Sequence, residues 1–123
     1  MMNSIDLNGH SHSFNVQFRV NYKVDYGQAI AIIGNTDEMG AWKHFKHCLH
    51  WTEGDNWVID MTLRQPYFMY KYVVVNYDTK EPIRWEEERN RIADLLLFEK
   101  GQKIIMNDMW EHYFVRFTIY YPL

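Results

Sequence analysis

Cysteine, long apolar runs and an excess of one charge are all nearly absent from this sequence of 123 residues. The single cysteine, Cys48, excludes an internal disulfide, which is typical of proteins from a reducing compartment. No stretch reaches the roughly 18 apolar residues of a membrane span. The first residues carry neither the basic nor the apolar region of a secretory signal. We therefore expect a cytoplasmic protein without a membrane partner.

The formal net charge is only −3. Nucleic-acid binding needs a basic face that neutralises phosphates, so we expect no nucleic-acid partner. Aromatic residues, in contrast, make up 17% of the chain, which is more than a core of this size needs. Some rings should therefore be exposed, and exposed rings commonly bind something.

Alternation of apolar and polar residues is the main structural signal. In the segment 14–22, Val16, Phe18, Val20 and Tyr22 point one way, which predicts a half-buried strand. Similar or shorter apolar runs predict strands at 29–33, 57–63, 68–75, 92–98, 103–106 and 113–121, whereas 43–51 is ambiguous. With no convincing amphipathic helix, the pattern predicts an all-β fold. We expect an antiparallel, immunoglobulin-like β-sandwich, an open-sided distorted barrel of about seven to eight strands.

The expected organisation is one domain with a short extension at each end. Residues 1–13 are polar and predict a flexible segment, and residues 14–111 form the domain. The tail 112–123 has two interpretations, because Val115–Tyr121 alternates in the same phase as Val16–Tyr22. It is either an extra strand or the start of a second copy of the domain. A tail belonging to a second copy could also form a strand-swapped dimer.

A tryptophan set among charges, Trp85 between Arg84 and Glu86, predicts a surface ring rather than a core residue. Several motifs lie around it in a fixed order: Gly34-Asn35 then Met39-Gly40-Ala41-Trp42, a strand opened by Trp57, Tyr70-Lys71-Tyr72, Trp85-Glu86 with Asn90-Arg91, and Asp108-Met109-Trp110. In this order they resemble the starch-binding domain, the family 20 carbohydrate-binding module, over roughly residues 14–110. One departure is Met39 where the family usually has leucine, a swap that nearly conserves volume.

The resemblance implies non-catalytic binding of α-1,4-glucans such as starch, glycogen and maltooligosaccharides, without a cofactor. It implies a first site in which Trp42 and Trp85 are paired stacking rings. Lys71, Glu86 and Asn90 would hydrogen-bond the sugar hydroxyls, while Glu87 and Glu88 read as solvent-facing charge.

A second site implied by the resemblance uses Tyr26 and Trp57. The family often has another aromatic residue in the loop before Trp57, but here that loop, 52–56, is short and has none. Trp51 could substitute, although packing is its simpler role. The second site is therefore an open expectation.

Three other functions remain as alternatives. A glycosidase would need two carboxylates about 5–10 Å apart across a cleft, and consecutive Glu86, Glu87 and Glu88, even with Asp60, do not provide them. A zinc site could use His44, His47 and His50 with Cys48, but on a strand this spacing puts the histidines on alternating faces. The third alternative is a sandwich whose exposed rings bind a partner chain.

The module is expected to belong to a larger protein with a catalytic domain. Two tandem copies would resemble the plant-type cytosolic 4-α-glucanotransferase, and phosphatases and phosphodiesterases also carry the module. Two linked copies would gain avidity for a polymer.

Overall fold

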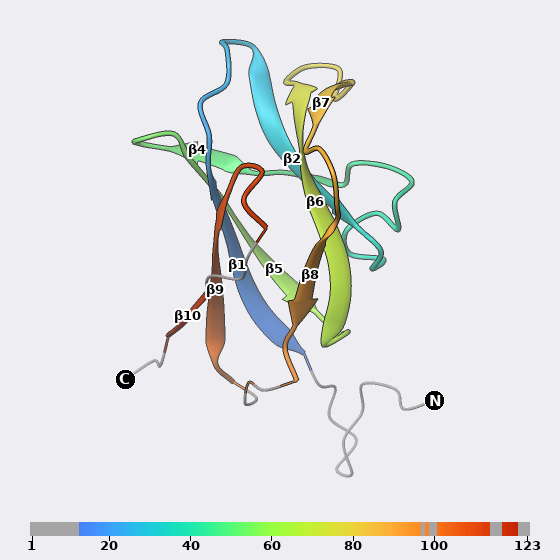
Figure 1. The fold of residues 1–123 in the computed structure, drawn as a ribbon, viewed down its shortest axis with the longest axis vertical. Helices are drawn as coiled ribbons and strands as arrows, with labels where there is room; N and C mark the ends of the chain where they lie inside the picture. The colour runs from blue at the N-terminus through green and yellow to red at the C-terminus, as the bar shows by residue number, and fades with distance from the viewer. Residues whose placement is uncertain (1–12, 97, 99–100, 114–116, 121–123) are drawn as a thin grey trace.

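The computed structural model describes residues 13–96, 98, 101–113 and 117–120, and these ranges are built from strands in two packed sheets (Figure 1). Within them, no helix has the length and apolar character needed to cross a bilayer. The strands are β1 (Phe14–Asn21), β2 (Gln28–Gly34), β3 (His47–Cys48), β4 (His50–Thr52), β5 (Asn56–Leu63), β6 (Tyr67–Asn76), β7 (Pro82–Trp85), β8 (Arg91–Asp94), β9 (Lys103–Met109) and β10 (Phe117–Tyr120).

The first sheet has the order β10-β9-β1-β5-β4, and β1 lies at its centre. β1 pairs antiparallel with β5 but parallel with β9. The prediction of an antiparallel β-sandwich is confirmed, and β1 with β9 is the one parallel pair among the described strands. Parallel neighbours need a long connection, and the whole second sheet provides it between β1 and β9.

The second sheet has the order β3-β2-β6-β7, with β8 also paired to β6. β2 and β6 are paired antiparallel over seven residues, from Gln28 with Asn76 to Gly34 with Tyr70. Both strands read as nearly continuous apolar runs, and most of their residues are buried. They form the centre of the second sheet.

The core lies between the two sheets. Val16, Phe18 and Val20 of β1 are buried, as the alternation predicts, and the Phe18 ring packs edge-on against Tyr70 at 5.1 Å. Edge-to-face contact is a favourable arrangement for aromatic rings, whose faces are negative and edges positive. Tyr22, just past β1, is only half buried and stacks on Trp110 at 4.4 Å.

Several strand boundaries differ from the sequence prediction. The ambiguous segment 43–51 contributes two short edge strands, β3 and β4. The strand predicted at 92–98 ends at Asp94: the Leu95 N–H still donates to the Pro66 carbonyl at 2.6 Å, but Pro66 has no N–H with which to continue the ladder. Trp85 is the last residue of the short exposed strand β7, and the loop that follows it, the Trp85 loop, spans residues 86–90.

The C-terminal strand β10 pairs antiparallel with β9 and so forms the edge of the first sheet. A following second copy and a strand-swapped dimer both stay predictions. The N-terminal segment expected to be flexible lies, up to residue 12, outside the described residues.

Candidate functional site: two aromatic hollows

Trp42 and Trp85 line one surface hollow of about 480 Å³. They come from separate parts of the chain, and both side chains are partly exposed, at 37% and 42%. The remaining lining residues are Ile33, Lys43, His44, Phe45, Lys80, Glu81 and Pro82. The hollow therefore presents two large rings and several charged groups to solvent.

The loop after β2 positions Trp42 through an uncommon backbone. Gly40, Ala41 and Trp42 all have positive φ, at 87°, 51° and 61°. A non-glycine residue in this region is strained, and such strain is often kept at functional sites. Hydrogen bonds from Ala41 N to Thr36 O (2.9 Å) and from Trp42 N to Gly34 O (2.9 Å) hold the loop in this shape. The main chain thus fixes the point from which the Trp42 side chain leaves the loop.

The loop requires glycine at position 40 for two reasons, its positive φ and the lack of space for a side chain. A matched pair of variants separates the two effects. A Cβ at Gly40 would lie 2.0 Å from the His44 carbonyl oxygen, whereas one at Gly27, with the same φ of 87°, would meet nothing within 4 Å. Gly27→Ala should therefore lower the free energy of unfolding by about 1 kcal/mol, the cost of the backbone alone. Gly40→Ala should lower the free energy of unfolding by about 1–3 kcal/mol more than Gly27→Ala does, because the backbone at His44 must move to make room for the added methyl group. Urea denaturation of both variants checks this, and equal losses would contradict it.

Trp85 ends β7, where it pairs with Val73 of β6. Phe45 lies beside it, with ring centroids 5.6 Å apart and planes tilted by 46°. Phe45 was not among the residues expected from the sequence, because it lies in the ambiguous segment 43–51. A ring contact of this kind supports the indole from one side and leaves part of it exposed.

Glu86 is fully buried, and its carboxylate is occupied by protein groups. It accepts hydrogen bonds from Arg91 Nε (3.0 Å) and Nη2 (2.6 Å), and from the backbone N–H of Tyr72 (3.0 Å) and Glu111 (2.8 Å). The expectation that Glu86 meets sugar hydroxyls therefore does not fit the structure. The carboxylate has no free acceptor position facing solvent, and its role here is structural.

Lys71 and Asn90 also lie outside the set of residues lining the hollow. Lys71 is buried and donates to the backbone carbonyl of Glu86 at 2.9 Å, so its ammonium group holds the start of the Trp85 loop. Asn90 is exposed at the end of that loop, and of the three predicted polar residues only its side chain is open to solvent.

Arg91 joins Glu86 to a second buried carboxylate. Its Nη1 lies 3.5 Å from Asp108 Oδ1, and its Nη1 and Nη2 also donate to the carbonyls of His112 (2.9 Å) and Met109 (2.5 Å). Burial lowers the pKa of Arg91, but its bonds to Glu86 and the charge of Asp108 outweigh this, so the net pKa is raised. The guanidinium group therefore stays charged.

The other oxygen of Asp108, Oδ2, accepts bonds from the hydroxyls of Tyr70 and Tyr72, each at 2.8 Å. The pKa of both tyrosines is raised well above the usual range, mainly by burial and next by the charge of Asp108. Their hydroxyls therefore stay protonated and remain donors. Burial also raises the pKa of Asp108, although Arg91 and the two hydroxyls act in the opposite direction. This network ties the Trp85 loop to β6 and to the end of β9.

A second, larger hollow of about 830 Å³ contains all three residues expected at the second site, Tyr26, Trp51 and Trp57. Tyr26 is fully exposed and Trp51 is 56% exposed. Trp57, however, is buried, and its indole N–H donates to the Tyr22 carbonyl at 3.1 Å. Only two of the three expected rings can therefore offer a face to a ligand.

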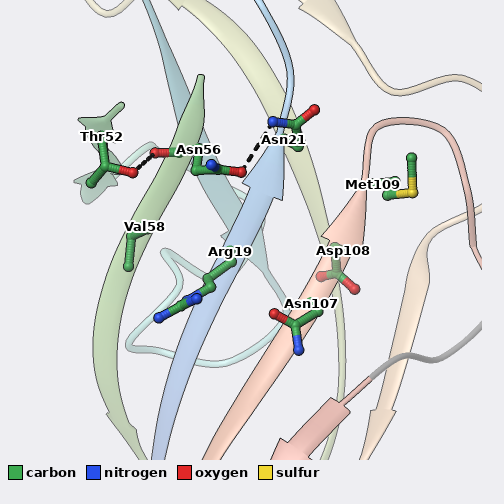
Figure 2. Close-up of a pocket in the computed structure, with 8 residues that line it drawn as sticks. All are labelled: Arg19, Asn21, Thr52, Asn56, Val58, Asn107, Asp108 and Met109. Carbon is green, nitrogen blue, oxygen red and sulfur yellow. Dashed lines mark hydrogen bonds between the residues drawn. The ribbon is translucent and has the colours of Figure 1, made fainter. Parts of the chain in front are cut away.

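A third hollow, of about 470 Å³, lies on the outer face of β1, β5 and β9 and has no aromatic lining (Figure 2). Arg19, Asn107 and Met109 lie in it, and Asn21 Nδ2 is already bonded to Asn56 Oδ1 at 3.0 Å. Without rings it cannot stack on a flat apolar ligand.

The histidine cluster considered for zinc does not assemble in the described part of the chain. Among these residues no three His, Cys, Asp or Glu side chains come close enough to hold a metal ion. Cys48 is half-buried, and burial raises the pKa of its thiol.

Comparison with known proteins gives the family and the fold. The model of the family described as the starch binding domain matches residues 13–103. The family 20 module of a maltotetraose-forming amylase from Pseudomonas saccharophila is a structural match over 77% of this chain and 98% of that one, with a TM-score of 0.59 at 17% identity.

Two glucoamylases match a larger share of this chain. The Hypocrea jecorina family 15 enzyme matches 82% of it with a TM-score of 0.72 at 20% identity. The Hormoconis resinae enzyme matches 82% with a TM-score of 0.65 at 23% identity. In each, the matching region is only 18% of the glucoamylase chain. The present chain therefore corresponds to a small part of those proteins.

Proposed function

Because the chain belongs to the starch-binding domain family, a non-catalytic binding module, we propose that it holds α-1,4-glucans by stacking their sugar rings on Trp42 and Trp85. The observation that carries this proposal is that both indoles, from separate parts of the chain, line one hollow and remain partly exposed. A pyranose ring has an apolar face of C–H groups, which pack on the negative face of an aromatic ring.

The charged lining of the first hollow supports the same function. Sugar hydroxyls that lose water need hydrogen-bond partners, since an unmet polar group is costly. Lys43, His44 and Glu81 lie around the rings and offer both donors and acceptors. They take the place of Glu86 and Lys71, whose polar groups face the protein interior.

Glu86 and Asp60, two of the carboxylates considered for hydrolysis, do not form a hydrolytic pair. Glu86 is paired with Arg91 at 2.6 Å in the interior. Asp60 lies on β5 in the other sheet, 3.4 Å from Lys103 Nζ. A glycosidase needs two carboxylates about 5–10 Å apart on either side of the scissile bond. Incubation of the domain with starch should therefore release no reducing ends.

The experiment that tests the proposal is calorimetric titration with maltoheptaose and with β-cyclodextrin. We expect binding in the micromolar-to-millimolar range, with quenching or enhancement of tryptophan fluorescence. Cellohexaose is the matched control, because it contains the same sugar units in a straight β-linked chain, whereas an α-1,4-glucan curves. Equal affinity for both sugars, or no affinity for the α-glucans, would contradict the proposal.

We also propose that the domain directs an attached catalytic domain to a polysaccharide. The glucoamylase matches support this, since in them the corresponding region is a small part of a longer enzyme. A tandem second module would increase avidity for a polymer. The single cysteine favours a cytoplasmic setting for that protein.

A further inference from the structure

Tyr77 lines the second hollow together with Tyr26 and Trp51, although it lies in a different turn, between β6 and β7. It is 60% exposed, so its ring is open to a ligand in the hollow. Neither the sequence pattern nor the resemblance singled it out. We propose that Tyr77 is a stacking ring of a second glucan site, an inference that rests on the proposed function.

Tyr26 and Tyr77 are brought together by a direct bond between their turns. The backbone N–H of Tyr77 donates to the Gly27 carbonyl at 2.8 Å, which joins the β6–β7 turn to the turn that carries Tyr26. Both turns lie at the same end of the sandwich, at the top of Figure 1. Trp51 is fixed by its own bond, from Nε1 to Asp55 Oδ1 at 2.9 Å. The bonds thus join the two turns that carry Tyr26 and Tyr77 and hold the Trp51 indole on its own hairpin.

The turn that carries Tyr77 is itself well ordered by hydrogen bonds. Asn76 Oδ1 accepts from the backbone N–H of Asp78 and of Thr79, each at 2.9 Å. The Lys80 ammonium donates to the Tyr77 carbonyl and lies 4.6 Å from the centre of its ring. A ring held on one side before a ligand arrives loses less freedom on binding, which favours affinity.

Tyr77 replaces a ring that this chain cannot provide elsewhere in the hollow. Trp57 is buried, and the loop 52–56 has no aromatic residue. Two exposed rings, Tyr26 and Trp51, would remain without Tyr77. With it, the hollow has three exposed rings, which suits a stretch of several sugar units.

The rim of this hollow offers hydrogen-bond acceptors to a sugar. The lining includes the three carboxylates Asp25, Asp55 and Asp78 together with His50, and the Lys80 ammonium lies beside the Tyr77 ring. Carboxylates accept hydrogen bonds from hydroxyls. The rim therefore suits the hydroxyl groups of a glucan.

The test uses the Trp42→Ala/Trp85→Ala background, in which the first hollow has lost its rings. Binding of β-cyclodextrin is followed by NMR titration in this background alone and with Tyr77→Ala, Tyr77→Phe or Tyr67→Ala added. Tyr67 is the matched control, because it is 54% exposed at the opposite end of β6. Thermal unfolding of each variant confirms that it is folded.

We expect the background to keep one weak binding event, which Tyr77→Ala weakens about tenfold or more and which Tyr77→Phe and Tyr67→Ala preserve. An unchanged affinity in Tyr77→Ala would overturn the inference. So would a background that binds nothing while the wild type binds, because the second hollow would then be inactive. Failure of the wild-type domain to bind any α-glucan would instead overturn the proposed function.

Discussion

Replacing both Trp42 and Trp85 with alanine is expected to remove glucan binding at the first hollow while leaving the domain folded. Stacking of a flat ligand on an exposed aromatic ring is worth about 1–3 kcal/mol per ring. Each single variant should therefore weaken binding by about 5- to 150-fold, since 1.4 kcal/mol is a factor of ten. Calorimetry with maltoheptaose should show the loss of the tighter event in the double variant.

Each tryptophan variant should lose some stability, because more than half of each residue's surface is out of solvent, so binding is measured well below the unfolding temperature of each variant. Ile92→Ala is a suitable control: Ile92 is 50% exposed on β8 and lines neither aromatic hollow. It should bind maltoheptaose as the wild type does. If the double variant also kept wild-type affinity, the first hollow could not be the main glucan site.

Much of the fold could be predicted from local pattern alone. Alternation in β1 and the apolar runs of β2 and β6 identified the central strands, because burial on one face or both dictates the residue type at each position. The short edge strands β3 and β4 carry no such signal, since edge residues face solvent and can be of almost any type. The parallel pairing of β1 with β9 depends on the path of the whole chain, which no local pattern records.

For the candidate site, the sequence indicated the aromatic residues better than the polar ones. The resemblance named Trp42 and Trp85, and they do line one hollow, but no spacing in the sequence shows that they meet. By resemblance Glu86 was expected to hydrogen-bond sugar hydroxyls at the surface, yet its side chain is buried. Its pairing with Arg91 could be suspected only from the positive residue that closes the loop. Tyr77 gave no signal, because a tyrosine in a turn is commonly incidental.

Breaking the buried pair between Glu86 and Arg91 is expected to have the largest effect on stability. The two side chains are almost fully buried and 2.6 Å apart. Removal of one partner leaves an uncompensated charge in the interior, which typically costs about 3–5 kcal/mol. Arg91→Ala should lower stability more than Glu86→Gln does. It removes the positive charge that faces both Glu86 and Asp108, and it also removes the donor to two backbone carbonyls. Chemical denaturation measures both losses.

Glu87→Gln is the matched control for Glu86→Gln, since it makes the same chemical change at the next residue. The Glu87 side chain is exposed, and a surface substitution of this kind usually changes stability by about 0.5 kcal/mol or less. A loss at Glu86 no larger than that at Glu87 would contradict a structural role for the pair.

The same network should also govern glucan binding, although its groups do not line the hollow. Glu86 follows Trp85 directly, and its bonds to Tyr72 N and Glu111 N fix the loop on both sides. Glu86→Gln, measured well below its unfolding temperature, should therefore bind maltoheptaose more weakly than Glu87→Gln, because Trp85 is less well oriented. A carboxylate that contacted sugar directly would give the same loss of affinity but no loss of stability. The two measurements together thus distinguish an internal anchor for Trp85 from a hydrogen-bonding partner of the glucan.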